Sequence, residues 1–378
     1  MTHRSRPAIA GIAGCLIAAL LAGCADDSYV GSGEWERKPS PAAPEAPGPQ
    51  KPSPPSGSDP STPQQQDDMV RATNLDQPSS IAPLPDGTAF VAERTSGKVT
   101  RVYPTKAMPA QLAFTVPGID AANGGGLLSI VASPHYAENG LIFAFVTTAT
   151  EGQVVTINAA GVPKPVITGL PRSAGALAIG PDGSVLVATG GSGDALAGKI
   201  LSTDPWGGPG PSATNGLIVG TGVPNPLGLC SDGVNVYVVD GGSGAAGSLS
   251  GNAVFKVAGE PTDSGGLGNA NDPLIAYTAG KDAGAAACLA TETAIITAGT
   301  DSQSLMTSVL DKDGQPTSEP TLSLTGTYGR LRALALDPVK GGLWIATYNR
   351  DGIGTPGAED DRVLYVPLPE GGGGGDVS

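Results

Sequence analysis

One pattern recurs six times along the chain, and it limits the possible folds more than any other feature of the sequence. Each copy is an apolar run, a turn and a second apolar run with alternating polar residues, as in Ala176-Leu-Ala-Ile-Gly-Pro-Asp-Gly-Ser-Val-Leu-Val-Ala188. The copies follow one another about every 50 residues, a period typical of propeller blades. Their turns are centred on Asp86, His135, Asp182, Asp232, Thr291 and Asp337, the fifth copy being degenerate.

Asp-Gly between alternating apolar runs is a strong hairpin signal, because Gly adopts positive φ without steric penalty. A further apolar run follows in most copies, over residues 98–103, 153–157, 253–257 and 362–366. The 57 Gly and 35 Pro also disfavour helices. Since one four-stranded sheet cannot bury both faces alone, the units must stack. The sequence therefore predicts an all-β fold, a six-bladed β-propeller over residues 70–369. The alternative is a β-sandwich with accidental spacing.

The N-terminus has the pattern of a targeting segment. Arg4 and Arg6 precede an apolar stretch over residues 8–21, which is too short to span a bilayer but fits a secretory signal. It ends in Leu21-Ala-Gly-Cys24, which resembles a bacterial lipobox. We therefore expect residues 1–23 to be a lipoprotein signal peptide and Cys24 to carry acyl chains such as palmitate. They would hold the protein at the cell membrane, on its extracytoplasmic face. An ordinary signal peptide with a chance Cys is the alternative.

Residues 24–69 read as a disordered Pro-rich linker. Ten prolines fall between Pro39 and Pro63, interleaved with small and polar residues that could not form a core. Such segments extend as polyproline II, so the expected role is to space a folded head from the membrane. At the other end, residues 370–378 form a Gly-rich tail.

Two cysteines remain once the signal and the lipidation site are set aside. Cys15 leaves with the signal, so Cys230 and Cys288 are left in an exported chain that meets an oxidising compartment. We expect them to form a disulfide that joins the inner parts of the fourth and fifth blades. Free buried thiols are the alternative.

Charge and histidine content exclude several functions. A formal charge of −14 with only 21 Lys and Arg gives no electrostatic footprint for nucleic acid. The chain has two histidines, of which His3 leaves with the signal and His135 lies on a predicted surface turn. The sequence therefore offers no Ser-His-Asp triad and no His-based metal cluster. Asp311-Lys-Asp-Gly314 is faintly similar to a calcium loop but reads better as a plain turn.

Several motifs resemble, in order, those of the soluble PQQ-dependent sugar dehydrogenases, the glucose/sorbosone dehydrogenase family. They span about residues 78–367, and the last block is the most specific. The motifs are Pro85-Asp-Gly-x-x-x-Val-Ala-Glu-Arg94, Gly125-Gly-Leu-Leu128, Gly180-Pro-Asp-Gly183, Gly198-Lys-Ile-Leu201, Asn225-Pro-x-Gly228, Gly329-Arg-Leu-Arg332, and Asn349-Arg-Asp-Gly-x-Gly-Thr-Pro356 with Asp360-Asp-Arg362. With its lipobox, linker and cysteine pair, the chain is most similar to the mycobacterial LppZ-type lipoprotein branch.

This resemblance implies a six-bladed propeller in which PQQ lies over the central channel beside calcium, and a His takes the sugar hydroxyl proton while hydride moves to the quinone. Arg330 and Arg332 match the pair that holds the cofactor, and Asn225 matches the Asn of a His-Arg-Asn-Pro motif. Arginine suits a cofactor with three carboxylates. These three residues are the candidate cofactor-binding set. The alternative for both arginines is structural pairing with acids such as Asp360 and Asp361.

The chain departs from the family at several functional positions. The His and Arg of the His-Arg-Asn-Pro motif are Val223 and Pro224, and the catalytic His falls near Arg172 or Ser173. A Gly-Asp pair after the third blade is Gly190-Gly191, the Gln before Gly-Gly-Leu-Leu is Gly124, and the calcium loop is replaced by residues 240–247. No catalytic residue can be assigned, and loss of a general base typically costs about 10²–10⁴ in rate.

Two functional hypotheses follow. The first is a lipid-anchored relative of the PQQ sugar dehydrogenases, with PQQ and calcium as cofactors, that oxidises a sugar or alcohol. The second is a non-catalytic envelope propeller that binds an anionic ligand or an envelope protein. A calcium-dependent lactonase-type hydrolase is a weaker third, since no convergent acidic ligands can be located. Family resemblance favours the first hypothesis, and the site residues favour the second.

Overall fold

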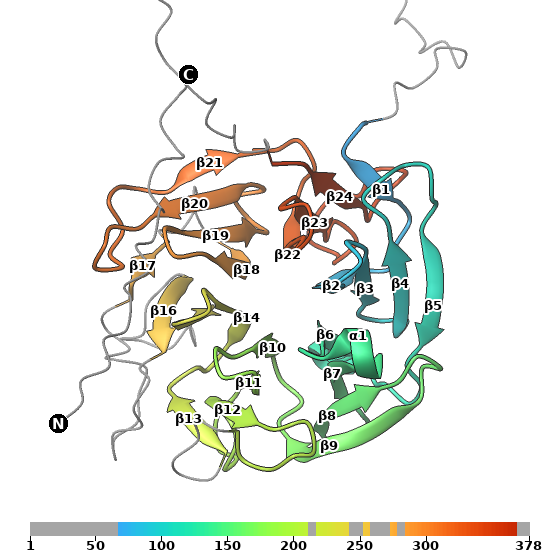
Figure 1. The fold of residues 1–378 in the computed structure, drawn as a ribbon, viewed down its shortest axis with the longest axis vertical. Coiled ribbons are helices and arrows are strands. Elements are labelled where there is room, and N and C mark those ends of the chain that lie inside the picture. Colours follow the sequence, from blue (N-terminus) through green and yellow to red (C-terminus); the bar gives the residue numbers. More distant parts are fainter. Residues whose placement is uncertain (1–66, 211–216, 242–251, 258–272, 278–283, 369–378) are drawn as a thin grey trace, which may run out of the picture. The chain divides into compact units, whose positions relative to one another are not determined.

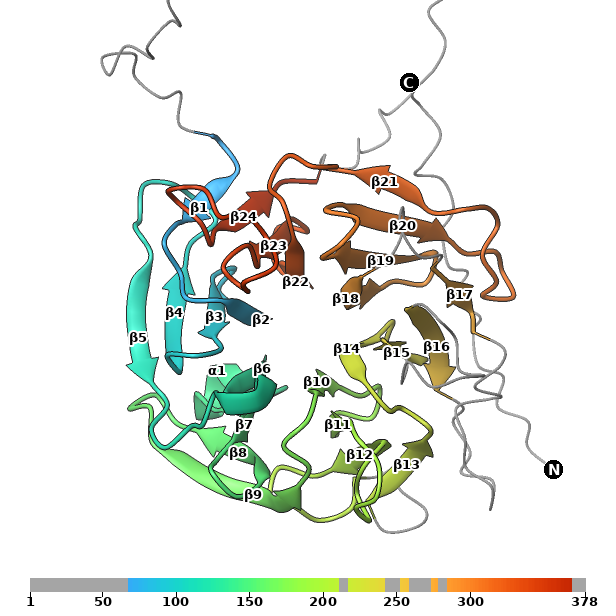
Figure 2. The same cartoon turned by 180° about the vertical axis from the view of Figure 1, so that it is seen from behind.

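Six antiparallel sheets of four strands are arranged as the blades of a propeller in the computed structural model (Figures 1 and 2). The structure describes residues 67–210, 217–241, 252–257, 273–277 and 284–368. They belong to one compact unit that spans residues 66–368. The expected signal peptide, Cys24, the linker before Asp67 and the tail at 370–378 lie outside the described residues. Among the described residues, no helix is long and apolar enough to cross a membrane.

The blades follow the chain from the innermost strand outward. Blades 1 to 3 are built from β2 (Pro78–Pro83), β3 (Ala89–Glu93), β4 (Lys98–Val102) and β5 (Gln111–Thr115); β6 (Leu127–Ala132), β7 (Ile142–Thr147), β8 (Gly152–Ile157) and β9 (Pro163–Leu170); and β10 (Gly175–Ile179), β11 (Val185–Thr189), β12 (Lys199–Thr203) and β13 (Ile218–Thr221). Blades 4 to 6 are built from β14 (Pro226–Ser231), β15 (Val236–Asp240), β16 (Ala253–Val257) and β17 (Ile275–Ala276); β18 (Ala285–Ala290), β19 (Ala294–Gly299), β20 (Leu305–Val309) and β21 (Thr321–Ser323); and β22 (Leu331–Leu336), β23 (Leu343–Thr347), β24 (Val363–Val366) and β1 (Val70–Ala72).

The repeat prediction is confirmed, because each of the six copies forms the inner hairpin of one blade. In the first hairpin, the Asp86 carboxylate accepts a hydrogen bond from the Thr88 amide at 3.0 Å and Gly87 has φ +79°. The degenerate fifth copy still turns, because the Thr291 hydroxyl accepts from the Ala294 amide at 3.1 Å. A threonine hydroxyl thus replaces the aspartate oxygen.

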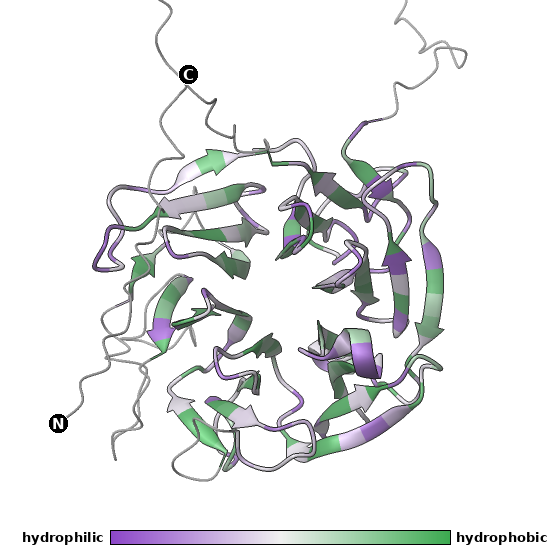
Figure 3. Cartoon of the chain, in the orientation of Figure 1, coloured by the Kyte–Doolittle hydropathy of each residue, from purple (hydrophilic) through white to green (hydrophobic). Residues whose placement is uncertain are grey.

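Among the described residues, the hydrophobic core consists of six clusters, one at each junction between neighbouring blades. The cluster between blades 1 and 2, for example, joins Phe90 and Val99 to Leu127 and Ile142. Apolar residues recur along the strands of every blade (Figure 3). Both faces of every sheet are therefore covered by the next blade, and this excludes the sandwich alternative.

The ring closes by joining the two ends of the described chain. Strand β1 adds to β24 as the outermost strand of blade 6, with Val70 opposite Leu364 and Ala72 opposite Val363. Beside this pair the Tyr328 hydroxyl donates to the Asp67 carboxylate at 2.6 Å. The sixth blade therefore needs residues from both termini of the propeller.

The inner strands begin on one side of the ring, which we call the Arg face, since Gln77, Asn225 and Arg330 directly precede β2, β14 and β22. The inner hairpins lie on the opposite side, the hairpin face. His135 lies there, directly before the one-turn helix α1 (Tyr136–Asn139). Its side chain is 70% exposed, and its only ion-pair partner among the described residues is Glu138 at 3.9 Å. The predicted surface position is confirmed, although one helical turn replaces the expected plain turn. A short 3₁₀ segment, η1 (Ala122–Gly124), precedes β6.

The predicted disulfide is present. Cys230 of β14 and Cys288 of β18 are bonded, with Cα atoms 5.7 Å apart and 58 residues between them in the sequence. The bond joins the inner strands of blades 4 and 5, as the sequence predicts.

Replacing both cysteines with alanine should lower the free energy of unfolding by about 4 kcal/mol, because the cross-link removes loop entropy from the unfolded chain. Urea unfolding of the two proteins measures the difference. In the native unreduced protein both thiols should resist alkylation. Rapid labelling of Cys230 and Cys288 without reductant would contradict this bond.

Candidate functional site

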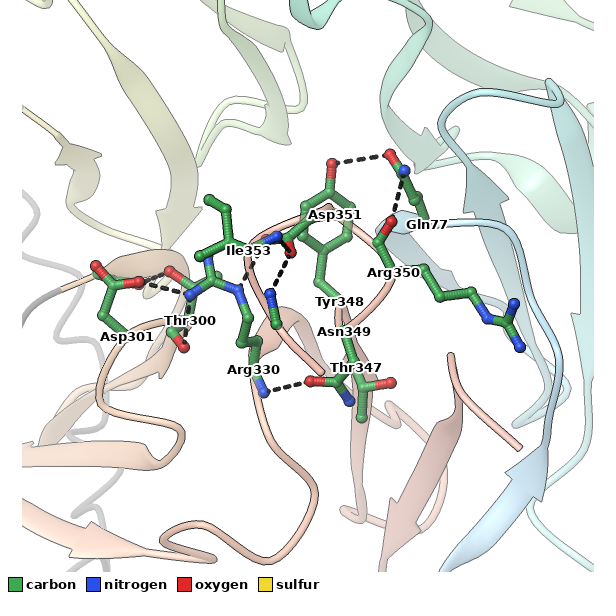
Figure 4. Close-up of polar contacts among 12 residues, drawn as sticks. Gln77, Thr300, Asp301, Arg330, Thr347, Tyr348, Asn349, Arg350, Asp351 and Ile353 are labelled. Carbon is green, nitrogen blue, oxygen red and sulfur yellow. Dashed lines mark hydrogen bonds and ion pairs between the residues drawn. The ribbon is translucent and has the colours of Figure 1, made fainter. Parts of the chain in front are cut away.

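A tight loop on the Arg face positions the first candidate arginine. Gly329 has φ +74°, and a Cβ atom there would lie 2.3 Å from Oδ1 of Asn349, so only glycine fits. The Asn349 amide holds the loop from both sides. Its Oδ1 accepts from the Arg330 amide at 2.8 Å, and its Nδ2 donates to the Tyr328 carbonyl at 2.8 Å. Arg330 of the Gly-Arg-Leu-Arg motif is thus hydrogen-bonded to the Asn of the final block (Figure 4).

Arg330 is neutralised by two carboxylates. Its Nε donates to Asp351 at 2.8 Å and its Nη1 to Asp301 at 2.7 Å (Figure 4). The Asp351 side chain is 6% exposed and the Asp301 side chain 55%. Burial alone would raise the pKa of Asp351, but hydrogen bonds from Gly354 and Ile353 and the charge of Arg330 hold it below its ordinary value. Because the two carboxylates offset the charge of the Arg330 guanidinium, it attracts an anionic ligand only weakly.

The sequence alternative is that the candidate arginines pair with acids such as Asp360 and Asp361. Neither acid pairs with Arg330 or Arg332. Asp360 instead pairs with Arg362 at 3.0 Å. Asp361 is fully buried and accepts hydrogen bonds from the backbone amides of Asn349 and Arg350. Structural pairing therefore applies to Arg330, but through Asp301 of the β19–β20 loop and Asp351 of the β23–β24 loop.

Arg332 has a different environment. It is the second residue of β22, and its Nη1 donates to the carbonyls of Leu227, at 3.1 Å, and Ala286, at 2.5 Å. These are the second residues of β14 and β18, so the side chain reaches across to blades 4 and 5. No carboxylate of the described residues forms an ion pair with it. Burial lowers the pKa of this guanidinium, which nevertheless remains a cation at neutral pH.

A second arginine lies near Arg332 and was not identified as a site residue from the sequence. Arg94 donates to Oε1 of Gln77 at 2.7 Å, and its Cζ lies 5.9 Å from the centre of the Tyr348 ring. The Tyr348 hydroxyl donates to the same Gln77 oxygen at 3.3 Å (Figure 4). Burial raises the pKa of Tyr348, and the charges of Arg94 and Arg332 oppose this rise. Both cations thus act on one phenol, and each lowers the cost of placing an anion beside them.

Asn225 lies on the same face, at the start of β14. Its amide donates to the buried Asp240 carboxylate at 3.0 Å, and its carbonyl accepts from Gly241 at 2.9 Å. Arg332 contacts Leu227, two residues further along the chain. The structure therefore brings Asn225 and Arg332 to one region and turns Arg330 toward its own acids.

The positions expected for the histidines of the family hold other groups. Arg172 is bound to Asp120 at 2.5 Å, and Val223 is fully buried. His135 lies on the opposite face, and no other His follows residue 3 in the whole sequence. The described residues contain no cluster of three or more His, Cys, Asp or Glu that could hold a metal ion. Residues 242–247 of the replaced calcium loop lie outside the described part of the chain.

Comparison with known proteins supports the predicted resemblance. The family model Glucose / Sorbosone dehydrogenase matches residues 75–196, which lie in blades 1 to 3. The PQQ-bound aldose sugar dehydrogenase of Streptomyces coelicolor is 27% identical, with a TM-score of 0.68, and the match covers 79% of this chain and 96% of that one. A putative glucose dehydrogenase of Thermus thermophilus is 26% identical, with a TM-score of 0.67 and coverages of 79% and 98%. No curated protein matches the chain.

The apo aldose sugar dehydrogenase of Escherichia coli, 15% identical over 79% of this chain and 99% of that one, has a TM-score of 0.59 and supports the fold alone. The chain is thus a six-bladed propeller that resembles the PQQ-dependent glucose/sorbosone dehydrogenases. Its residues fit only part of a PQQ–calcium centre. Arg94 and Arg332 suit the carboxylates of such a cofactor, whereas Arg330 is neutralised and no His base is present among the described residues of this face.

The raised pKa of the buried Asp361 can be tested through the pH dependence of stability. Burial raises its pKa, the charge of Asp360 adds to the rise, and the hydrogen bonds that it accepts only partly oppose it. The native state therefore binds this proton more tightly than the unfolded state. The contribution of Asp361 to stability should be full below about pH 3.9 and fall as the pH rises through its raised pKa.

Urea midpoints of the parent and Asp361→Asn, measured between pH 3 and 7, test this sign. The variant should gain stability relative to the parent as the pH rises. Asp351→Asn is the matched control with a lowered pKa, and its deficit should instead grow as the pH rises toward about 3.9. Parallel profiles for parent and Asp361→Asn would contradict the assignment.

Proposed function

We propose that this protein is a non-catalytic propeller of the cell envelope that binds an anionic ligand on its Arg face. The observation that carries the proposal is Arg332, a partly buried guanidinium whose only hydrogen-bond partners among the described residues are two backbone carbonyls. A partly desolvated cation without a counter-ion among the described residues is costly, and Arg94 adds a like charge. A bound anion would remove this cost and accept charge-assisted hydrogen bonds.

Sugar oxidation of the kind that the family resemblance implies would need a general base on this face. His135 is on the other face. Burial raises the pKa of Asp361, but this carboxyl is fully buried, and both of its oxygens already accept hydrogen bonds. Neither group is available to take a proton from a sugar hydroxyl.

A PQQ-dependent sugar dehydrogenase is the second candidate. It is favoured by the 27% identity to the PQQ-bound Streptomyces enzyme and by the retained Gly329-Arg-Leu-Arg332 motif. PQQ and calcium would then be the cofactors, and a sugar or alcohol the substrate.

The cellular setting is also part of the proposal. We infer from the lipobox and the Pro-rich segment that Cys24 is lipidated, that the propeller lies on the extracytoplasmic face of the cell membrane, and that the chain belongs with the mycobacterial LppZ-type lipoproteins. Its partner would be a small anionic ligand or an envelope protein.

Calorimetric titration with PQQ and with citrate, each without calcium, tests the anion site. Replacement of Arg332 by Gln should weaken PQQ binding about 10- to 100-fold, the value of one charge-assisted hydrogen bond. Arg101 pairs with Asp86 of the first inner hairpin, so Arg101→Gln on the hairpin face is the matched control and should leave binding unchanged. Equal affinity for parent and Arg332→Gln would contradict the site.

Dye-coupled oxidation of glucose and other aldoses, with PQQ and calcium supplied, separates the two candidates. We expect no turnover in the parent or in an Arg330→Ala/Arg332→Ala variant. Turnover of about one per second or more in the parent, lost in the variant, would establish the dehydrogenase instead.

Lipidation has its own test. Cys24→Ser should leave unprocessed or soluble protein in the exported fraction, because the acylated thiol is lost. Fractionation of cells that express each form measures this. A variant that stays on the membrane after signal cleavage would refute the lipoprotein assignment.

A further inference from the structure

A cavity of about 560 Å³ lies along the axis of the ring. All six inner strands line it, from Ser79, Leu128 and Leu227 near the Arg face to Val131, Leu336 and Pro338 near the hairpin face. This volume is in the range of sites for small organic ligands, and it exceeds what a single ion needs.

Aliphatic side chains supply much of the cavity wall. Leu128, Ile179, Leu229, Leu289 and Leu336 all contribute to the lining. An innermost strand would also expose unpaired backbone groups to the cavity, which normally favours water. Some of these backbone groups form hydrogen bonds with side chains of the protein instead.

Two serines satisfy backbone groups of neighbouring inner strands. The Ser80 hydroxyl accepts from the Ile130 amide and also lies 3.1 Å from the Ile130 carbonyl. The Ser129 hydroxyl accepts from the Leu177 amide at 3.1 Å. These bonds reduce the cost of filling the cavity with an apolar group, because fewer backbone groups would lose water.

The Arg-face end of this cavity lies next to Arg332, which has no counter-ion among the described residues. Arg332 donates to the carbonyls of Leu227 and Ala286, and both residues belong to the cavity lining. Its Nε and Nη2 atoms have no hydrogen-bond partner among the described residues. A guanidinium thus contacts two lining residues at the Arg-face end of an aliphatic cavity.

From this juxtaposition we propose that the cavity binds a single-chain aliphatic carboxylate, with its carboxylate on Arg332 and its alkyl chain along the ring axis. The inference rests on the proposed anion site and names the class of its ligand. Arg332 supplies charge recognition, and the inner strands supply recognition of the chain. A compact anion would use only the charge recognition by Arg332.

A chain-length series tests both halves on the full chain. Calorimetry with butanoate, hexanoate, octanoate and decanoate should give affinities that rise about fourfold per methylene, the ratio for burial of one CH₂ group at ~0.8 kcal/mol. Decanol, which has the same chain without the charge, should bind at least tenfold more weakly than decanoate. Flat affinity from butanoate to decanoate would overturn the proposal.

Two variants separate this inference from the anion site itself. Ala335 lines the cavity away from Arg332, so Ala335→Phe should abolish the chain-length dependence and leave citrate or PQQ binding intact. Val339→Phe, on an exposed position of the hairpin face, is the size-matched control and should change nothing. Arg332→Gln should reduce decanoate binding to the level of decanol.

Binding of PQQ or citrate through Arg332 without a chain-length effect would retain the proposed function and refute the aliphatic ligand. Decanoate binding that is unchanged in Arg332→Gln would refute the proposed placement of the carboxylate. The chain-length series uses the unmodified protein, so its result does not depend on whether Ala335→Phe folds.

Discussion

The structure depends on the burial of both faces of every sheet against its neighbours. Six apolar clusters occupy the six junctions between blades, so no blade has an independent core. Stacking in a ring aligns the inner strands and brings their first residues to one face. That is why Arg332 meets Leu227 and Ala286, which lie 105 and 46 residues earlier in the sequence, at one level. The geometry of the site follows from the packing of the ring.

The Arg face combines a neutralised arginine with two that form no ion pair with an acid of the described residues. Arg330 is held by Asp301 and Asp351, and the clamp of Asn349 on the Gly329 loop fixes its backbone. Arg94 and Arg332 contact amide or carbonyl oxygens and no described carboxylate. A family motif can thus keep its amino-acid sequence while the charges that it presents to a ligand change.

The sequence was sufficient for the architecture because the architecture is repetitive. Six hairpins, their turns and the disulfide between Cys230 and Cys288 could be predicted from local patterns and cysteine count. Closure of the ring by β1 could not be predicted, since Val70–Ala72 is too short to show a periodic pattern. The acids around Arg330 were also missed. Asp301 and Asp351 come from loops of two blades, and only the ring brings them together. Arg94 carried a motif signal, whereas Gln77 carried none.

Strand β1 has a mechanical consequence. It is three residues long and pairs with β24 at two positions, yet it is the first element of the ring that the chain reaches from its N-terminal side. Any tension transmitted along the preceding chain is therefore applied first to these few hydrogen bonds. Blade 6 would lose its outer strand before force reached the longer strands around it. The disulfide joins blades 4 and 5, so it cannot reinforce the pairing of β1 with β24.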